Sequence, residues 1–398
     1  GIIGLDSEEK DAGLSEKRGP GWATRKGHVC GVSAAWHEGE SVNSVYVPVA
    51  HPDTDNFDKD AVKRWLNDHV KAGVRFVMHN AGYDIGWLHA DVGMDVPDAS
   101  QIEDSACAAY MVDENRLAYD LDSLSRSEGL PGKDYELLLE HHVDACFDTV
   151  HPQLDLWRTP ARFAADYAVR DAIDALLLFE CMVPRLESEG TFDAYRLEMD
   201  IVPVVHAMRK RGVRLDLDAC DRAYKKFKQQ SQEALDEIYR KFNEKVRIED
   251  VRRNDWLRWM FDLHKIPYPI NPITGNASFE AKWMKGYDHD LPKLLVRAKS
   301  RDEAAEKFIA NYLLSYQVNG RLHASINQYK TEEGSGTRTY RFSYDSPPMQ
   351  QMPSRDEEMS ADVRGCFLPD EGEYWAKCDY SQQEYRLFVH FAELTAMN

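Results

Sequence analysis

Two acidic side chains stand two positions apart near the start of the chain, in the stretch Asp6-Ser7-Glu8. Side chains two apart on a β-strand point to the same face, so both carboxylates would project together from a strand predicted to begin at Ile2–Leu5. A pair so placed repels itself unless a cation or a proton lies between its members. The stretch therefore indicates a cation site, with a solvated acidic edge as the alternative, because the pattern also arises by chance in an acidic chain. Glu9 should point to the opposite face and take no part as a ligand.

Two later motifs offer chemistry of the same kind. The segment His79–Asp84 has the form N-x-x-[FY]-D and comes at the end of an apolar strand predicted over Arg75–His79. Tyr167 and Asp171 lie four positions apart and therefore share one face of a predicted helix. In order and spacing, the three motifs resemble the DEDDy 3′–5′ exonuclease family, the proofreading domain that precedes a family A DNA polymerase.

The resemblance implies a role for each of these residues. The four metal-binding carboxylates would be Asp6, Glu8, Asp84 and Asp171. Tyr167 would orient the attacking water, and Asn80 would lie near the terminal nucleotide. The cofactors would be two Mg²⁺ or Mn²⁺ ions, because a metal pair about 3.5–4 Å apart supplies a hydroxide and clamps the leaving oxygen, and hard cations prefer carboxylate oxygens. Ser7 and Glu9 depart from the residues that are usual in the family.

The elements around these motifs predict a mixed sheet covered by helices. Further strands are expected at His28–Trp36 and Ser44–Val49. Helices are expected at residues 60–72, from residue 83, and at 102–113, 122–128, 135–142 and 160–186. Asp104 either supports the carboxylates or caps a helix, and the sequence leaves both readings open.

Composition describes an acidic protein without a membrane segment. The 398 residues carry a net charge of −19, and residues 1–192 hold 17 Lys and Arg against 35 Asp and Glu, whereas the remainder holds 32 against 33. No apolar run approaches the roughly 18 residues of a membrane span, and the start of the chain lacks the pattern of a secretory signal. Seven scattered cysteines without a C-x-x-C pair indicate reduced core residues. A cytoplasmic location, in bacteria or in an infected host cell, is therefore expected.

Near its end the chain carries a second chemical signature, besides that of the three carboxylate motifs. A short buried strand is predicted at Trp375–Cys378 and an amphipathic helix at Gln382–Leu394, with an aspartate at their junction. The segment Asp379–His390 resembles motif A of family A DNA polymerases, usually written DYSQIELRVLAH. Gln383 and Tyr385 replace apolar residues of that motif.

This second resemblance implies half of a polymerase centre. Asp379 would hold Mg²⁺ for phosphoryl transfer, with the Tyr380 carbonyl beside it. Glu384 would act as the steric gate against a ribose 2′-hydroxyl. Family A synthesis also needs a fingers helix and a second palm aspartate, and both are expected to follow Asn398.

The region between the two signatures resembles the start of a polymerase domain. A helix at Tyr195–Arg211 and a strand at residues 213–216 are expected to open it, and the long Lys-rich helix at Leu217–Glu244 would belong to a thumb that grips phosphates. A solvated helix face is the alternative for these lysines. Residues 250–330 are expected to continue as helices broken by a loop at 266–276, and residues 331–339 are predicted to be a flexible loop.

Two residues in this region would contact primer–template DNA. The stretch Thr339–Ser343 stands where T-G-R-[LF]-S is usual in the family, with Tyr340 in place of Gly. Arg341 would contact the duplex through its charge, and Gln350, in the stretch Pro347–Pro353, would lie at the minor-groove edge.

The full expectation is the N-terminal part of a replicative, phage-type family A polymerase. An α/β exonuclease domain with an RNase H-like mixed sheet would cover residues 1–192, a mainly α thumb 193–330, and an incomplete α+β palm 331–398. The partners would be single-stranded DNA ends, primer–template DNA, dNTP and a C-terminal polypeptide that completes the palm. That polypeptide would cover an apolar helix face formed by Leu387, Phe388, Phe391 and Leu394.

Two alternatives remain at this point. One is a stand-alone nuclease with a vestigial polymerase half, and the other is a non-catalytic primer–template-binding subunit. Retention of Asp379 and Glu384 argues against a vestige, and the complete carboxylate set argues against a purely binding role.

Overall fold

The computed structural model describes residues 1–133, 140, 152–330 and 336–397. Its first part is a five-stranded sheet in the order β3-β2-β1-β4-β5. The strands are β1 (Ile2–Asp11), β2 (Gly27–Glu38), β3 (Ser41–Pro48), β4 (Arg75–Met78) and β5 (Ile102–Asp104). β1, β2 and β3 pair antiparallel, whereas β4 pairs parallel to β1 and β5 parallel to β4. The expected mixed sheet is therefore confirmed.

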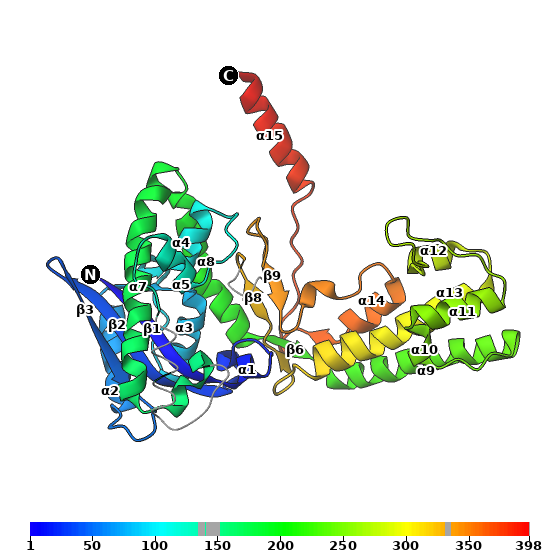
Figure 1. Cartoon of the computed structure of the whole chain (residues 1–398), viewed down its shortest axis with the longest axis horizontal. Helices are drawn as coiled ribbons and strands as arrows, with labels where there is room; N and C mark the ends of the chain where they lie inside the picture. The colour runs from blue at the N-terminus through cyan, green and yellow to red at the C-terminus, as the bar shows by residue number, and fades with distance from the viewer. Residues whose placement is uncertain (134–139, 141–151, 331–335, 398) are drawn as a thin grey trace.

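Helices pack against this sheet and share its core. They are α2 (Lys59–Lys71), α3 (Ala81–Trp87), α4 (Ser105–Val112), α5 (Leu121–Ser127), α7 (Ala161–Ser188) and α8 (Phe192–Arg211). The long helix α7 crosses the sheet and contacts β1 and β2 (Figure 1). At Gly4 of β1 a side chain would fall against the backbone of Ala172 in α7, so only glycine allows this close approach.

The predicted start of one helix in this part is wrong. Residues 102–113 were expected to be helical throughout, but Ile102, Glu103 and Asp104 pair with β4 as a strand, and the helix begins only at Ser105. The cause is tertiary, because a parallel strand buried on both faces has no alternating pattern to reveal it. The helix expected at 135–142 lies almost entirely outside the described residues.

The second part of the chain is mainly helical. It contains α9 (Leu217–Phe242), α10 (Ile248–Val251), α11 (Asn254–Leu263), α12 (Ala281–Gly286) and α13 (Asp290–Glu303), which continues as the π-helical segment η5 (Ala304–Leu314). The long helix predicted from residue 217 is confirmed. Figure 1 shows these helices at the opposite end of the molecule from the five-stranded sheet.

Small sheets lie between the two ends. One has the order β10-β6-β7, formed by β6 (Val213–Leu215), β7 (Arg321–Leu322) and β10 (Phe367–Leu368). The other is the hairpin of β8 (Ser325–Asn327) and β9 (Ser343–Asp345). The hairpin stands beside the first part of the chain (Figure 1), and β8 contacts α8.

The last described segment extends away from the rest of the molecule. After α14 (Glu357–Arg364) the chain reaches α15 (Gln383–Met397), which projects into solvent in Figure 1. The buried strand predicted at Trp375–Cys378 is wrong, because these residues form no strand and Trp375 is 62% exposed. A strand needs a neighbour for its backbone groups, and no described strand pairs with this segment.

The predicted apolar face of the last helix is exposed. Leu387 is 50%, Phe388 70% and Phe391 62% accessible to solvent. No helix of the described residues has the length and apolar character needed to span a membrane.

Candidate active site

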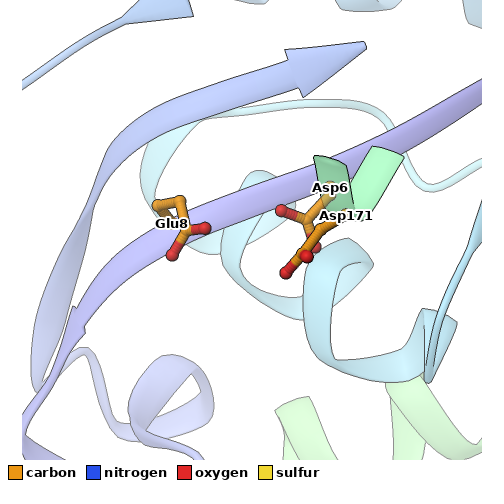
Figure 2. A group of neighbouring side chains, drawn as sticks. All are labelled: Asp6, Glu8 and Asp171. Carbon is orange, nitrogen blue, oxygen red and sulfur yellow. The ribbon is translucent and has the colours of Figure 1, made fainter. Parts of the chain in front are cut away.

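Three of the predicted carboxylates converge in one place. Ligand oxygens of Asp6, Glu8 and Asp171 all lie within 4.8 Å of one another. Figure 2 shows Asp6 and Glu8 on the same strand, β1, and Asp171 approaching from α7. The alternation of side chains on β1 places Asp6 and Glu8 on one face, and the close approach of α7 at Gly4 brings Asp171 near them.

The fourth predicted carboxylate, Asp84, lies apart from that group of three. Its Oδ1 accepts hydrogen bonds from the Ser7 amide at 3.1 Å and from the Ser7 hydroxyl at 2.8 Å. Ser7 lies between Asp6 and Glu8, so its side chain faces the other way from theirs along the strand. All four carboxylates nevertheless line one cleft of about 980 Å³. We call Asp6, Glu8, Asp84 and Asp171 the carboxylate site.

Burial and mutual repulsion favour the protonated forms of these acids. Burial, then the charges of Asp171 and Asp84, raise the pKa of Asp6 well above its usual value. Burial and Asp171 raise the pKa of Glu8 to about 8, and burial raises that of Asp84 to about 7. A cation bound at such a cluster would favour the ionised forms instead.

A lysine supplies positive charge beside the site. The ammonium of Lys133 lies 2.8 Å from Oδ2 of Asp171 and 5.2 Å from the centre of the Tyr167 ring. Burial alone would lower the pKa of this ammonium, but Asp171, Tyr167 and Asp6 raise it well above its usual value. Tyr167 itself is 6% exposed and lines the same cleft.

Asp104 performs both of the functions that the sequence left open. It caps α4 by accepting hydrogen bonds from the amides of Ala106 and Cys107, at 2.9 and 3.2 Å. It also accepts from the amides of Asn80 and Ala81, at 3.1 and 2.9 Å. Asn80 adopts a left-handed conformation with φ 68° immediately before α3, the helix that carries Asp84. Asp104 therefore fixes the start of α3, and Asn80 lies on the wall of the cleft.

Asp379 and Tyr380, the residues expected at the polymerase centre, are more exposed to solvent than the residues of the carboxylate site. Both are exposed, Tyr380 by 81%, and among the described residues no group of ligands that could hold a metal ion includes Asp379. Arg341 forms an ion pair with Glu384, and both side chains are exposed. Gln350 donates a hydrogen bond to the Phe342 carbonyl. The structure thus joins Arg341 to Glu384 but brings neither of them to the carboxylate site.

Sequence reasoning missed two residues that shape the site. Ser7 holds Asp84, but in the sequence it only marked a departure from an apolar family position. Lys133 pairs with Asp171, yet it lies in a loop and no motif or periodicity singles it out. Glu9 is buried and is not a member of the ligand group formed by Asp6, Glu8 and Asp171.

The donor set fits divalent cations such as Mg²⁺ or Mn²⁺. The converging atoms are carboxylate oxygens, which hard cations prefer. Repulsion among these carboxylates adds to burial in raising their pKa values, and Lys133 pairs with Asp171, so positive charge at the cluster is favourable.

The chain is similar to known DNA polymerases. Residues 217–398 match the family model of DNA polymerase family A. The chain is 30% identical over 399 residues to a DNA-directed DNA polymerase of Pseudomonas phage M6, covering 98% of this chain and 58% of that protein. It is 29% identical to DNA polymerase DpoZ of Acinetobacter phage SH-Ab 15497, over 88% of this chain and 58% of that protein.

Bacterial enzymes are more distant relatives. DNA polymerase I of Pseudomonas aeruginosa is 24% identical over 93% of this chain and 39% of its own length. Among solved structures, the polymerase domain of Pol1 from M. smegmatis, in complex with DNA primer–template and dNTP, matches with a TM-score of 0.68 at 18% identity. The match covers 92% of this chain and 57% of that one.

These matches define first a class and then a family. The fold is that of a DNA polymerase of the Pol1 kind. More particularly, residues 217–398 match DNA polymerase family A, and phage DNA polymerases are among the proteins to which the chain is similar. It spans 58% of the length of the two phage relatives described above.

Proposed function

We propose that the first part of the chain, residues 1–192, removes nucleotides from 3′ ends of DNA, as a proofreading exonuclease of the DEDDy type with an RNase H-like sheet. The observation that carries the proposal is the convergence of Asp6, Glu8 and Asp171 in one cleft with Asp84, Asn80 and Tyr167. Acidic residues alone are common on protein surfaces. A buried or partly buried set in a cleft with strongly raised pKa values is typical of a functional site.

Each residue of the cleft would have its own role. Asp6, Glu8 and Asp171 would hold a divalent cation, and Asp84, fixed by Ser7, would serve a second one through water. When bound, such a metal pair generates the nucleophile and stabilises the leaving oxygen. Tyr167 would orient the attacking water from the wall of the cleft, and Asn80 would contact the terminal nucleotide.

The test is hydrolysis of a single-stranded oligonucleotide with a labelled 5′ end. Activity should require Mg²⁺ or Mn²⁺ and stop in EDTA. Asp6→Asn and Asp171→Asn should each reduce the rate at least ~10³-fold, as expected when a main electrostatic group of a catalytic site is removed. Asp60→Asn, which changes an exposed carboxylate on α2, should leave the rate unchanged. Equal hydrolysis in EDTA, or by the Asp6→Asn protein, would refute the proposal.

For the second part of the chain we propose primer–template binding, by a thumb at 193–330 and a partial palm at 331–398. The match of residues 217–398 to the family model and the likeness in fold to a polymerase solved with primer–template and dNTP support it. Asp379 would be a metal ligand for nucleotide addition, with Glu384 as the gate. Among the described residues no group of three or more possible metal ligands includes Asp379. The proposed synthesis would take its second palm carboxylate from a further polymerase segment, either continuous with this chain or on a separate polypeptide.

A complementation assay tests this second proposal. The chain should bind primer–template DNA by itself, and it should extend a primer with dNTP only when mixed with a polypeptide that carries the fingers and the second palm aspartate. Asp379→Ala should abolish the extension and leave the hydrolysis of single strands intact. Primer extension by the chain proven free of any second polypeptide would contradict the proposal.

A further inference from the structure

Four tyrosines from distant parts of the chain meet between the hairpin β8–β9 and the first part of the chain. The ring of Tyr110, on α4, stacks on that of Tyr329 with centroids 5.6 Å apart, meets Tyr340 edge-on at 5.3 Å and lies 4.8 Å from Tyr119. The hydroxyl of Tyr110 donates to the Thr337 carbonyl at 3.2 Å. We call these four tyrosines the tyrosine cluster. It joins the segment that carries Arg341 to the helix that Asp104 caps.

Tyr340 is held in place at a conformational cost. It occupies the position where the family usually has glycine. Its φ of 53° lies in the left-handed region, which residues other than glycine adopt with strain. Its hydroxyl is buried and has no hydrogen-bond partner among the described residues. Neither feature favours tyrosine, so the packing of its ring against Tyr110 must offset both. The side chain therefore serves as an anchor for the hairpin.

Tyr329 links the tyrosine cluster to Asp104 by a hydrogen bond. Its hydroxyl donates to Oδ2 of Asp104 at 3.1 Å. The same oxygen accepts the Ala81 amide, and the other oxygen accepts the Asn80 amide. Asp104 is thus shared by the hairpin and by the start of α3, the helix that carries Asp84.

We propose that Tyr329 and Tyr340 are positioning residues through which the polymerase-like hairpin holds the Asn80–Asp84 segment of the carboxylate site in place. The inference rests on the proposed nuclease function for its consequence on rate, but not for its structural content. Arg341, the proposed duplex contact, directly follows Tyr340. Binding of a primer–template to the hairpin would therefore reach the nuclease site through packed rings and one shared carboxylate, which is a continuous physical path.

The test uses the full chain and three variants. Tyr329→Phe keeps the ring and removes the donor to Asp104. Tyr340→Phe is the matched control, because the hydroxyl that it removes has no partner among the described residues. Tyr340→Gly restores the usual family residue, relieves the backbone and removes the anchor. Hydrogen–deuterium exchange at the amides of Asn80 and Ala81 is measured beside single-strand hydrolysis at saturating Mn²⁺.

In Tyr329→Phe, exchange at Asn80 and Ala81 should rise and kcat should fall about fivefold, as for the loss of one hydrogen bond, with KM for the oligonucleotide unchanged. Tyr340→Phe should match the wild type in both readouts. Tyr340→Gly should speed exchange at both the hairpin and residues 80–81. Wild-type exchange in Tyr329→Phe, or equal effects of the two Phe substitutions, would overturn the inference. A wild-type chain without nuclease activity would refute the proposed function instead, and exchange would still decide the positioning.

Discussion

Glu8 shows how a single side chain reports on the state of the site. It shares a strand face with Asp6 and lies near Asp171. In the absence of a metal ion, burial and the charges of Asp171 and Asp84 oppose its negative charge. Ser7, one position away, points elsewhere and fixes Asp84 with two hydrogen bonds. Successive residues of β1 therefore serve two halves of the same site.

The raised pKa of Glu8 predicts a pH-dependent stability. The pKa is about 8 in the folded state and near 4.5 in the unfolded state, so the unfolded state loses this proton first as the pH rises. The contribution of Glu8 to the free energy of unfolding is complete below pH ~4.5 and is lost as the pH rises through about 8. In EDTA, Glu8→Gln should therefore remove part of the decline in stability between about pH 5 and 8.

The measurement is urea unfolding at a series of pH values, with Glu40→Gln as the exposed control. Saturating Mn²⁺ should flatten the decline of the wild type, because a bound cation stabilises the ionised carboxylates. A decline that is the same in wild type and Glu8→Gln would show that Glu8 is not held protonated in the metal-free fold.

At the scale of elements, the packing of β1 on α7 determines whether Asp171 reaches Asp6. Any side chain at Gly4 would meet the backbone of Ala172, and a backbone cannot move aside as a flexible side chain can. Gly4→Ala should therefore destabilise the fold by about 1–3 kcal/mol, as overpacking of a core does, and weaken Mn²⁺ binding by separating the ligands. Gly82→Ala is the matched control, because a side chain there meets nothing within 4 Å. Thermal unfolding and Mn²⁺ titration of both variants check this, and unchanged metal affinity in Gly4→Ala would contradict it.

The exposed face of helix α15 leads to a prediction about self-association. Its exposed phenylalanines, Phe388 and Phe391, form an apolar face of a kind that soluble monomers rarely present. The double substitution Phe388→Ser with Phe391→Ser should reduce self-association of the chain and its binding of a hydrophobic dye. Sedimentation at several concentrations measures the first effect. Tyr374→Ser, which removes an exposed ring before the helix, serves as the control, and equal self-association of all three proteins would show that α15 is not the surface responsible.

The sequence predicted best those elements whose pattern is local. The helix from Leu217 and the strand carrying Asp6 and Glu8 have periodicities of their own, and the structure contains both. The strand at Ile102–Asp104 could not be predicted, because only pairing with β4 makes it a strand. The expected strand at Trp375–Cys378 has apolar residues but no described partner. The acidic residues of the site were predicted from their motifs. Lys133 could not be predicted, because it lies in a loop and no motif or periodicity marks it.

At the scale of the whole molecule, the two parts of the chain differ in their net charge and in the charged residues that they present. Residues 1–192 carry most of the net charge of −19, and the cleft there gathers carboxylates. The remainder is nearly neutral, but it places Arg341 and Glu384 on the surface as an exposed ion pair. An acidic first part would repel the phosphate backbone unless cations occupy its site, so duplex DNA should be held by the second part.

This arrangement predicts how the chain responds to salt and to two opposite substitutions. Binding of primer–template DNA should weaken linearly in log affinity against log salt, because Lys and Arg side chains bound to phosphates release counterions. Arg341→Ala should weaken binding by about 1–3 kcal/mol, as when a charged hydrogen bond is removed from an interface, and should make the salt slope shallower. Glu384→Gln should strengthen binding, because it frees the guanidinium that Glu384 now holds.

Arg64→Ala, which removes an exposed arginine on α2, is the control for net charge. Fluorescence anisotropy between about 50 and 300 mM salt, a range that brackets physiological ionic strength, distinguishes the variants. A contact at Arg341 weakens binding more than a distant charge does, because the guanidinium is desolvated only where it meets the phosphate. If Arg341→Ala and Arg64→Ala weaken binding equally, the affinity for DNA depends only on the overall charge of the protein, and Arg341 makes no specific contact with the duplex.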